Sequence, residues 1–417
     1  VTGMLFAVFQ QTVGSEVERL VDVRDGYLPL QDFAYHVELV RAYWEGVIPT
    51  IYTLDAQTKV LSERIGEPFQ YAMPVGMSPT ALVLLIPFTV VSRWGMSYAV
   101  GVWLAFSWAM LGIAVGWGWW LLREHAGRQR LWFATAMVAS VSAVALNATR
   151  LGQTSIVALA FLLLVVSELL AADRSKRAPR AAIVVIALAV LSLKAPYFII
   201  GAALLINHAQ WRPLGYAVGV LAVVVLSLMA FAEPSLLSSF AGQLTVYTGR
   251  ELPAAYQSVV VRETQFSLFG VALATNAPLF VLRLIPIVGL GAIVVLMALA
   301  LRGRTVGEGE RRRSAMSQGT MVVGVVGALL LLSPYSGRYE DLLLSLPLFV
   351  LVAQGPRGKS GAFLGALALL LVLLNIDVIL PGMSPAGGVL LKLGVLFAAL
   401  RAAGVSFRMG AAEPETS

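Results

Sequence analysis

Repeated apolar runs of about 20 residues constrain this chain more than any other feature. A run of that length spans the hydrocarbon core of a bilayer as one α-helix, and residues 155–172 form a clear example. Only 13% of the 417 residues are charged, whereas a soluble domain carries about 25%. The runs lack the alternation of polar and apolar residues that is typical of barrel strands. The sequence therefore predicts an all-α, polytopic membrane bundle that forms a single domain over 1–417.

Short basic loops orient the predicted crossings. The positive-inside rule places such loops in the cytoplasm, and here they are 123–130, 173–180, 302–316, 355–361 and 401–408. Between them the apolar segments pair as hairpins: 131–148 with 155–172, 317–333 with 338–353, and 362–380 with 385–403. This map predicts about twelve crossings of an inner membrane, with both termini in the cytoplasm.

Two long connections then fall on the outer face. The first, 14–96, contains an amphipathic segment at 33–45 that predicts a helix lying flat in the interface, with Tyr43 and Trp44 as anchors. Pro87 interrupts its apolar segment 78–95, which predicts a re-entrant or interfacial helix. The second connection is 233–276. The first crossing, 1–13, is shorter than a span and leaves open a start further upstream, and we expect the tail 409–417 to be disordered.

A break is predicted in the apolar stretch 181–211. Both of its flanks, Arg180 and Arg212, belong to the cytoplasmic side on this map. A single crossing would place these flanks on opposite sides of the membrane. Two short crossings that meet at "LKAPYF" keep both flanks in the cytoplasm and put Lys194 and Pro196 at the outer turn. Interrupted helices usually line a cavity, so Lys194 is a candidate site residue. The alternative is that Lys194 merely ends a helix near the lipid headgroups.

The composition excludes several kinds of chemistry. The chain has no Cys, which removes disulfides, thiol catalysis and cysteine-ligated metals. Its three His residues are too scattered for a metal cluster of the usual kind. The net charge of +7 reflects cytoplasmic loops rather than a nucleic-acid partner. We therefore expect no metal, no cofactor and no nucleic acid.

Several short motifs carry a family resemblance. They are "DFAYHVELVRAYWEG", "FQYAMPVGMSPTALVLLIPF", "RLGQTSIVALA", "LSLKAPYFII", "ETQFSLFG" and "LLLSPYSGRYEDLLLSLPL", in that order. Together they resemble glycosyltransferase family 87, the polyprenyl-phosphate-mannose-dependent α-mannosyltransferases of the GT-C superfamily. The resemblance covers nearly the whole chain. The chain departs from the family pattern at "QYAMPVGMSP", where the family usually has Tyr-Pro-Pro, and in its shortened first helix.

The resemblance, together with the positions of polar residues on the outer face, predicts roles for particular residues. The catalytic Asp of the family lies in the first external loop and corresponds to Asp32, which would act as the general base for the attacking hydroxyl. An alternative is that Asp32 caps the helix 33–45. The leaving phosphate needs cations, for which the candidates are Lys194, Arg262 and Arg338. The candidate substrate-binding residues are Gln153, Arg150, Tyr71, Gln265 and Tyr339, although Gln153 could equally cap the helix 155–172.

The function implied is an inverting transfer of a hexose or pentose from a polyprenyl-phosphate donor. The acceptor would be a lipid, glycan or protein hydroxyl on the extracytoplasmic face, within cell-envelope assembly. A transporter or lipid flippase is the alternative, favoured by Asp377 and Lys392 inside the last two predicted helices. A non-catalytic assembly subunit is a third interpretation. The absence of an internal repeat weighs against a transporter.

Overall fold

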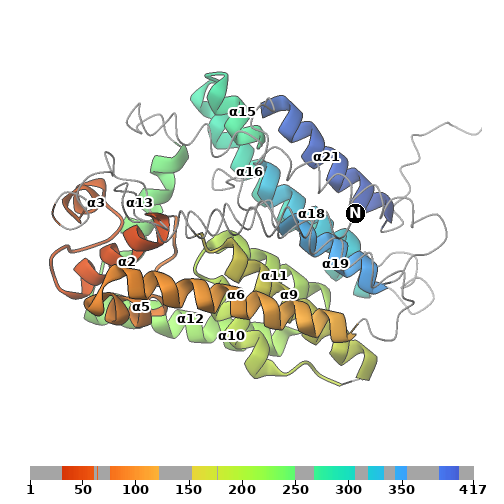
Figure 1. The fold of residues 1–417 in the computed structure, drawn as a ribbon. Helices are drawn as coiled ribbons and strands as arrows, with labels where there is room; N and C mark the ends of the chain where they lie inside the picture. Colours follow the sequence, from red (N-terminus) through yellow and green to blue (C-terminus); the bar gives the residue numbers. More distant parts are fainter. Residues whose placement is uncertain are drawn as a thin grey trace, which may run out of the picture.

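The computed structural model describes residues 31–60, 63, 76–121, 153–175, 177–248, 267–305, 318–332, 343–354 and 385–402. Every secondary-structure element in these ranges is helical, so the predicted all-α class is confirmed for them. Figure 1 shows two groups of helices, with several shorter helices gathered at one end. The helix α11 joins the groups, because it packs on α9 and α10 as well as on α16 and α18.

The first group holds the central part of the chain. Its members are α6 (Met96–Leu121), α9 (Ser155–Ser175), α10 (Ala181–Leu191), α11 (Ala195–Asn207) and α12 (Trp211–Phe231). The second group consists of α15 (Leu268–Ala274), α16 (Leu279–Thr305), α18 (Gln318–Leu332), α19 (Ser345–Gln354) and α21 (Pro385–Ala402). In this second group α18 packs against both α16 and α21.

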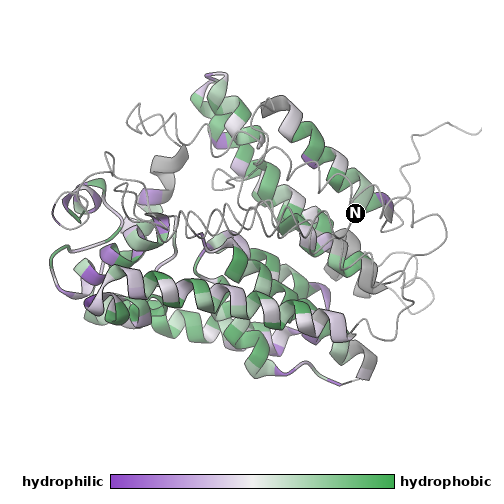
Figure 2. Ribbon diagram, viewed as in Figure 1, coloured by the Kyte–Doolittle hydropathy of each residue, from purple (hydrophilic) through white to green (hydrophobic). Residues whose placement is uncertain are grey.

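Short helices cover one end of the first group. They are α2 (Gln31–Trp44), α3 (Leu54–Val60), α4 (Ala81–Leu84), α5 (Ile86–Val91), the 3₁₀-helix η3 (Ser92–Trp94) and α13 (Leu236–Thr248). Figure 2 shows polar residues on α2 and α3, whereas α12 and α16 are largely apolar. Polar residues are therefore frequent at the end of the bundle that carries α2.

Four of the described helices are long and apolar enough to cross a membrane: Met96–Trp117, Ser155–Ala172, Trp211–Phe231 and Leu279–Leu299. Their surroundings differ. The segment in α9 is 94% buried by protein, and the segment in α12 only 11%. A helix that is apolar all round belongs at the centre of a bundle when neighbours cover it. Where neighbours are missing, as on α12, an apolar surface suits lipid. The figure of about twelve crossings stays a prediction.

The predicted break between two short helices is confirmed, since α10 and α11 are separated by Ser192, Leu193 and Lys194. Pro196 lies in the first turn of α11, where a missing N–H is tolerated. Gly201 lets α11 approach α10 closely, because a Cβ there would lie 2.6 Å from a methyl carbon of Leu188. Whether each short helix crosses the bilayer stays a prediction.

The helix α2 is more deeply covered than the predicted interfacial helix. The expected apolar stripe is present, with Phe33, Val37 and Val40 all buried and Trp44 45% exposed. However, Tyr35 and other residues outside that stripe are buried as well, because α2 packs on α3, α5 and α6. The interfacial placement of this helix stays a prediction.

The apolar segment 78–95 forms α4, α5 and η3 and folds back along α6. The turn occurs at Gly95, whose φ of 137° is open mainly to glycine. The predicted loop 233–276 contains α13 and α15, and the first residues of the predicted loop 302–316 continue α16 to Thr305. The predicted segments 1–13, 131–148, 362–380 and 409–417 lie outside the described residues.

Candidate functional site

Asp32 lies in the first turn of α2, which begins at Gln31. The helix therefore starts before Asp32, and the alternative in which this residue precedes and caps the helix is wrong. The next residue, Phe33, fixes the position of the turn. Its ring stacks on Trp103 of α6 at a centroid distance of 4.8 Å, and its edge meets Phe88 of α5 at 5.4 Å. Aromatic packing thus holds Asp32 in place from the residue beside it.

Gln153 connects Asp32 to Lys194. Its side-chain Nε2 donates a hydrogen bond to Asp32 Oδ2, and its Oε1 accepts one from Lys194 Nζ at 3.4 Å. Gln153 is buried just ahead of α9, and both polar atoms of its amide form hydrogen bonds inside the protein. In the alternative interpretation this side chain caps the helix 155–172, but here it bonds to Asp32 and Lys194. Three predicted site residues from distant parts of the chain therefore meet in one cluster.

Lys194 is 8% exposed, and its backbone is extended between α10 and α11. Its ammonium lies 5.7 Å from the ring centroid of Tyr197, within the range of a cation–π contact. A buried ammonium needs polar and anionic neighbours, and the Gln153 amide links it to the Asp32 carboxylate. The cluster is therefore a carboxylate and an ammonium linked by one amide.

The turn that carries Lys194 is anchored to a second segment. The N–H of Ser78 donates to the Leu193 carbonyl at 2.9 Å, and the Ser78 hydroxyl donates to the Ser192 carbonyl. The Thr80 hydroxyl also donates to the Ser192 carbonyl, at 3.1 Å. These bonds satisfy carbonyls that the end of α10 leaves free. They fix the backbone just before Lys194.

His36 lies one helical turn after Asp32. Its Nδ1–H donates to the Asp32 carbonyl oxygen, which leaves Nε2 as the acceptor of the neutral ring. Burial lowers the pKa of His36 to about 4, the hydrogen bond to Asp32 opposes this, and the positive charge of Lys194 lowers the pKa further. The imidazole is therefore neutral at physiological pH and offers the cluster a hydrogen-bond acceptor.

Sequence reasoning found Asp32, Gln153 and Lys194 but missed the supporting residues. His36 stands four residues after Asp32, a spacing that places both on one face of a helix. The hydroxyls of Ser78, Thr80 and Ser192 look in the sequence like ordinary turn residues. The remaining predicted site residues, Tyr71, Arg150, Arg262, Gln265, Arg338 and Tyr339, lie outside the described residues.

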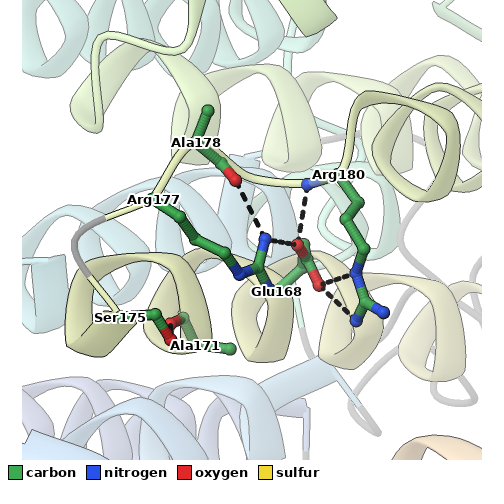
Figure 3. Close-up of polar contacts among 6 residues, drawn as sticks. All are labelled: Glu168, Ala171, Ser175, Arg177, Ala178 and Arg180. Carbon is green, nitrogen blue, oxygen red and sulfur yellow. Dashed lines mark hydrogen bonds and ion pairs between the residues drawn. The ribbon is translucent and has the colours of Figure 1, made fainter.

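A charged cluster marks the opposite end of the first group (Figure 3). The buried Glu168 of α9 accepts hydrogen bonds from Arg177 Nη1 at 2.7 Å and from Arg180 Nη2 at 2.8 Å. The Arg180 guanidinium also lies 5.0 Å from the ring centroid of Trp117 in α6. Glu168 is 15 residues after Gln153, which corresponds to about 22 Å along a helix. The Asp32 cluster and the two arginines therefore occupy different ends of the bundle.

No group of three or more His, Asp or Glu side chains within the described ranges is arranged to bind a metal ion. The cluster's own groups support acid–base chemistry and binding of an anion. A carboxylate accepts a proton, a neutral imidazole accepts a hydrogen bond, and a buried ammonium binds a negative charge. Such groups can support transfer of a chemical group from a phosphate to a hydroxyl.

Comparison with known families agrees with this chemistry. The family model described as glycosyltransferase family 87 matches residues 78–334, which is more than half of the chain. The match includes Gln153 and Lys194 but begins after Asp32. No curated protein and no solved structure matches the chain significantly. Since the matched region spans most of both helix groups, the chain belongs to glycosyltransferase family 87.

Proposed function

We propose that this membrane glycosyltransferase moves a sugar from a polyprenyl-phosphate donor to a hydroxyl of a lipid, glycan or protein. Membership of the family makes the chain a membrane glycosyltransferase. The finer assignment rests on one observation, the hydrogen-bonded connection from Asp32 through Gln153 to Lys194. This connection combines a proton acceptor with a cation, which are the two groups that transfer from a phosphate leaving group requires.

Asp32 acts as the general base in this proposal. The acceptor oxygen attacks the anomeric carbon of the donor sugar while its proton passes to the Asp32 carboxylate. A new carbon–oxygen bond forms as the bond from the anomeric carbon to the phosphate oxygen breaks, and its electron pair leaves with the phosphate. Attack opposite the leaving group inverts the anomeric configuration. Gln153 orients the carboxylate through its amide, and His36 accepts a hydrogen bond from a sugar hydroxyl.

Lys194 stabilises the negative charge that develops on the leaving phosphate. An ammonium that is 8% exposed acts in a low-dielectric surrounding, where a charge has a larger effect than in water. The bonds from Ser78 and Thr80 fix the backbone turn from which the Lys194 side chain extends. Arg262 and Arg338 are further candidates for the same phosphate, and they lie outside the described residues.

We assign the reaction to the extracytoplasmic face, in an inner membrane. The support is the pair Arg177 and Arg180 at the other end of α9 and α10, since short basic connections favour the cytoplasm. The apolar exposed surface of α12 offers the prenyl chain of the donor a lipid environment next to the bundle. A mannosyl donor is the family-based expectation for the sugar. Asp377, which would favour a transporter, lies outside the described residues.

The test is the variant Asp32→Asn, which preserves shape but removes the base. We expect the turnover number to fall by about 10²–10⁴, with unchanged binding of the polyprenyl-phosphate sugar. The matched control is Glu45→Gln, which removes a carboxylate from the other end of the same segment, beside Arg41. Transfer from a radiolabelled donor in detergent measures the rate. Undiminished transfer by Asp32→Asn would remove Asp32 as the base.

A further inference from the structure

A second polar cluster lies between the C-terminal end of α2 and the corner that joins α12 to α13. Its central residue, Glu233, is 5% exposed, and neither carboxylate oxygen makes a hydrogen bond of good geometry with the described residues, although the hydroxyls of Thr50 and Ser239 lie near it. The hydroxyl of Tyr43 is likewise buried without a partner there. The reaction at Asp32 uses neither group.

The fold does not need the Glu233 side chain to make this corner. The backbone N–H of Glu233 donates to the Leu228 carbonyl at 2.8 Å, and its carbonyl accepts from the Leu236 N–H at 3.0 Å. Both helix ends are therefore closed by main-chain bonds. The carboxyl group is free of a capping role and projects into the protein.

The surrounding side chains show what Glu233 faces. Burial raises the pKa of Glu233, while the nearby hydroxyls of Thr50 and Ser239 act in the opposite direction. Burial also raises the pKa values of Tyr43 and Tyr52, and the charge of Glu233 adds to both effects. One carboxyl group is thus close to two phenol rings and a threonine hydroxyl.

Leaving such groups unpaired is costly. Each buried polar group without a hydrogen bond destabilises a protein by about 1–3 kcal/mol. A bound ligand that supplies hydrogen bonds to Glu233 and Tyr43 would remove this cost. The set resembles the chemistry that binds sugars. A carboxyl group accepts hydrogen bonds from hydroxyls, a phenol donates or accepts one, and aromatic faces pack against the apolar side of a ring. Tyr52 and Phe240, with ring centroids 5.3 Å apart, form an aromatic wall beside the cluster.

The cluster lies just beneath the surface. Pro234 and Ser235, which follow Glu233 directly, are exposed, and so are Glu45 and Gly46 beyond α2. Tyr43 is 11 residues after Asp32, which corresponds to about 16 Å along α2. A glycan of a few rings has a comparable length.

We propose that Glu233 and Tyr43 form a second carbohydrate subsite, which binds a ring of a glycan acceptor that does not itself react. The proposal rests on the proposed transferase function in one respect, that the bound glycan is the acceptor of the reaction at Asp32. It narrows the acceptor from any hydroxyl to a glycan or glycolipid of more than one ring.

The test uses the full chain in lipid nanodiscs and a set of neutral disaccharides as probes: mannobiose, arabinobiose and cellobiose. Tryptophan fluorescence reports binding, because Trp44 touches Tyr43 at a ring distance of 5.4 Å and is partly exposed. We expect saturable binding of at least one disaccharide. Glu233→Gln and Tyr43→Phe should each weaken it by about tenfold or more. Ser238→Ala, an exposed hydroxyl on the same corner, is the matched control and should leave binding unchanged.

Two results would overturn the subsite: no saturable binding of any of the three disaccharides, or binding that both Glu233→Gln and Tyr43→Phe leave unchanged. Asp32→Asn separates the two proposals, because it should lose sugar transfer and keep disaccharide binding. Transfer that survives in Asp32→Asn contradicts the catalytic proposal alone. Suppose instead that Asp32→Asn weakens disaccharide binding and Glu233→Gln does not. The sugar would then bind at the Asp32 cluster, and the second subsite would be refuted.

Discussion

His36 should make the stability of this protein fall as the pH falls below neutrality. Its pKa is lowered from 6.5 to about 4, chiefly by burial. Between these two values the unfolded chain binds a proton at this residue and the folded protein does not. Unfolding is therefore favoured progressively as the pH drops through that window. Above pH 7 the residue is neutral in both states and has no effect.

The size of the effect follows from the two pKa values. At pH 5 the difference in protonation corresponds to a loss of about 2 kcal/mol relative to neutral pH. This is an upper value, because part of the ring reaches the surface and is screened by solvent. The variant His36→Gln has no titrating group, and its amide can still donate to the Asp32 carbonyl. Its stability should lack this component of the pH dependence.

Unfolding followed by tryptophan fluorescence in detergent micelles, at pH 7.5 and at pH 5, provides the measurement. Other groups titrate over the same range, and Glu233 acts with the opposite sign because its pKa is raised. These contributions are common to both proteins and cancel when wild type and His36→Gln are compared. If the two proteins lose the same stability between pH 7.5 and pH 5, the buried neutral His36 is refuted.

Three further predictions concern other parts of the bundle. Lys194→Met should lower kcat/KM for the polyprenyl-phosphate donor about tenfold or more, mainly through kcat, whereas Lys194→Arg should keep part of the activity. Unchanged donor kinetics in Lys194→Met would contradict its role. Glu168→Ala should destabilise the protein by about 2–4 kcal/mol in thermal unfolding, less than a fully buried ion pair because both arginines reach solvent; Glu168→Gln should cost less. Gly201→Ala should lower the free energy of unfolding by about 1–3 kcal/mol, because its Cβ would overlap Leu188. The control Gly215→Ala, whose added Cβ meets nothing within 4 Å, should be neutral or slightly stabilising in the same thermal unfolding assay.

Much of the fold followed from the sequence because it depends on local properties. Apolar runs form helices in lipid wherever their backbone groups can bond within the segment. The break at Lys194 was predictable because Arg180 and Arg212 both belong to the cytoplasmic side on the sequence map, and Pro196 suits the first turn of a helix. The burial of α2 was not predictable. Its apolar stripe suits a membrane surface as well as a protein surface, and only its neighbours α5 and α6 decide between them.

The site was predictable in part. Asp32, Gln153 and Lys194 were identified separately, the first through a family resemblance and the others through their unusual positions. Their hydrogen bonds join residues 121 and 41 positions apart in the chain, and no local pattern encodes such a contact. The hydroxyls of Ser78 and Thr80 and the ring of His36 were not predicted, because their contacts form only when α2, α10 and the segment before α4 are packed together.

The amino-acid sequence by itself determined the membrane-spanning class of this protein, the helix break and the residue types available for catalysis. These follow from hydropathy, from the geometry of proline and from side-chain chemistry, which act over a few residues at a time. The tertiary structure alone decided that an aspartate, an amide and a lysine form one connected cluster, and that Glu233 and Tyr43 are buried near one another. Contacts of this kind depend on the packing of helices distant in the chain, which no local pattern of residues encodes.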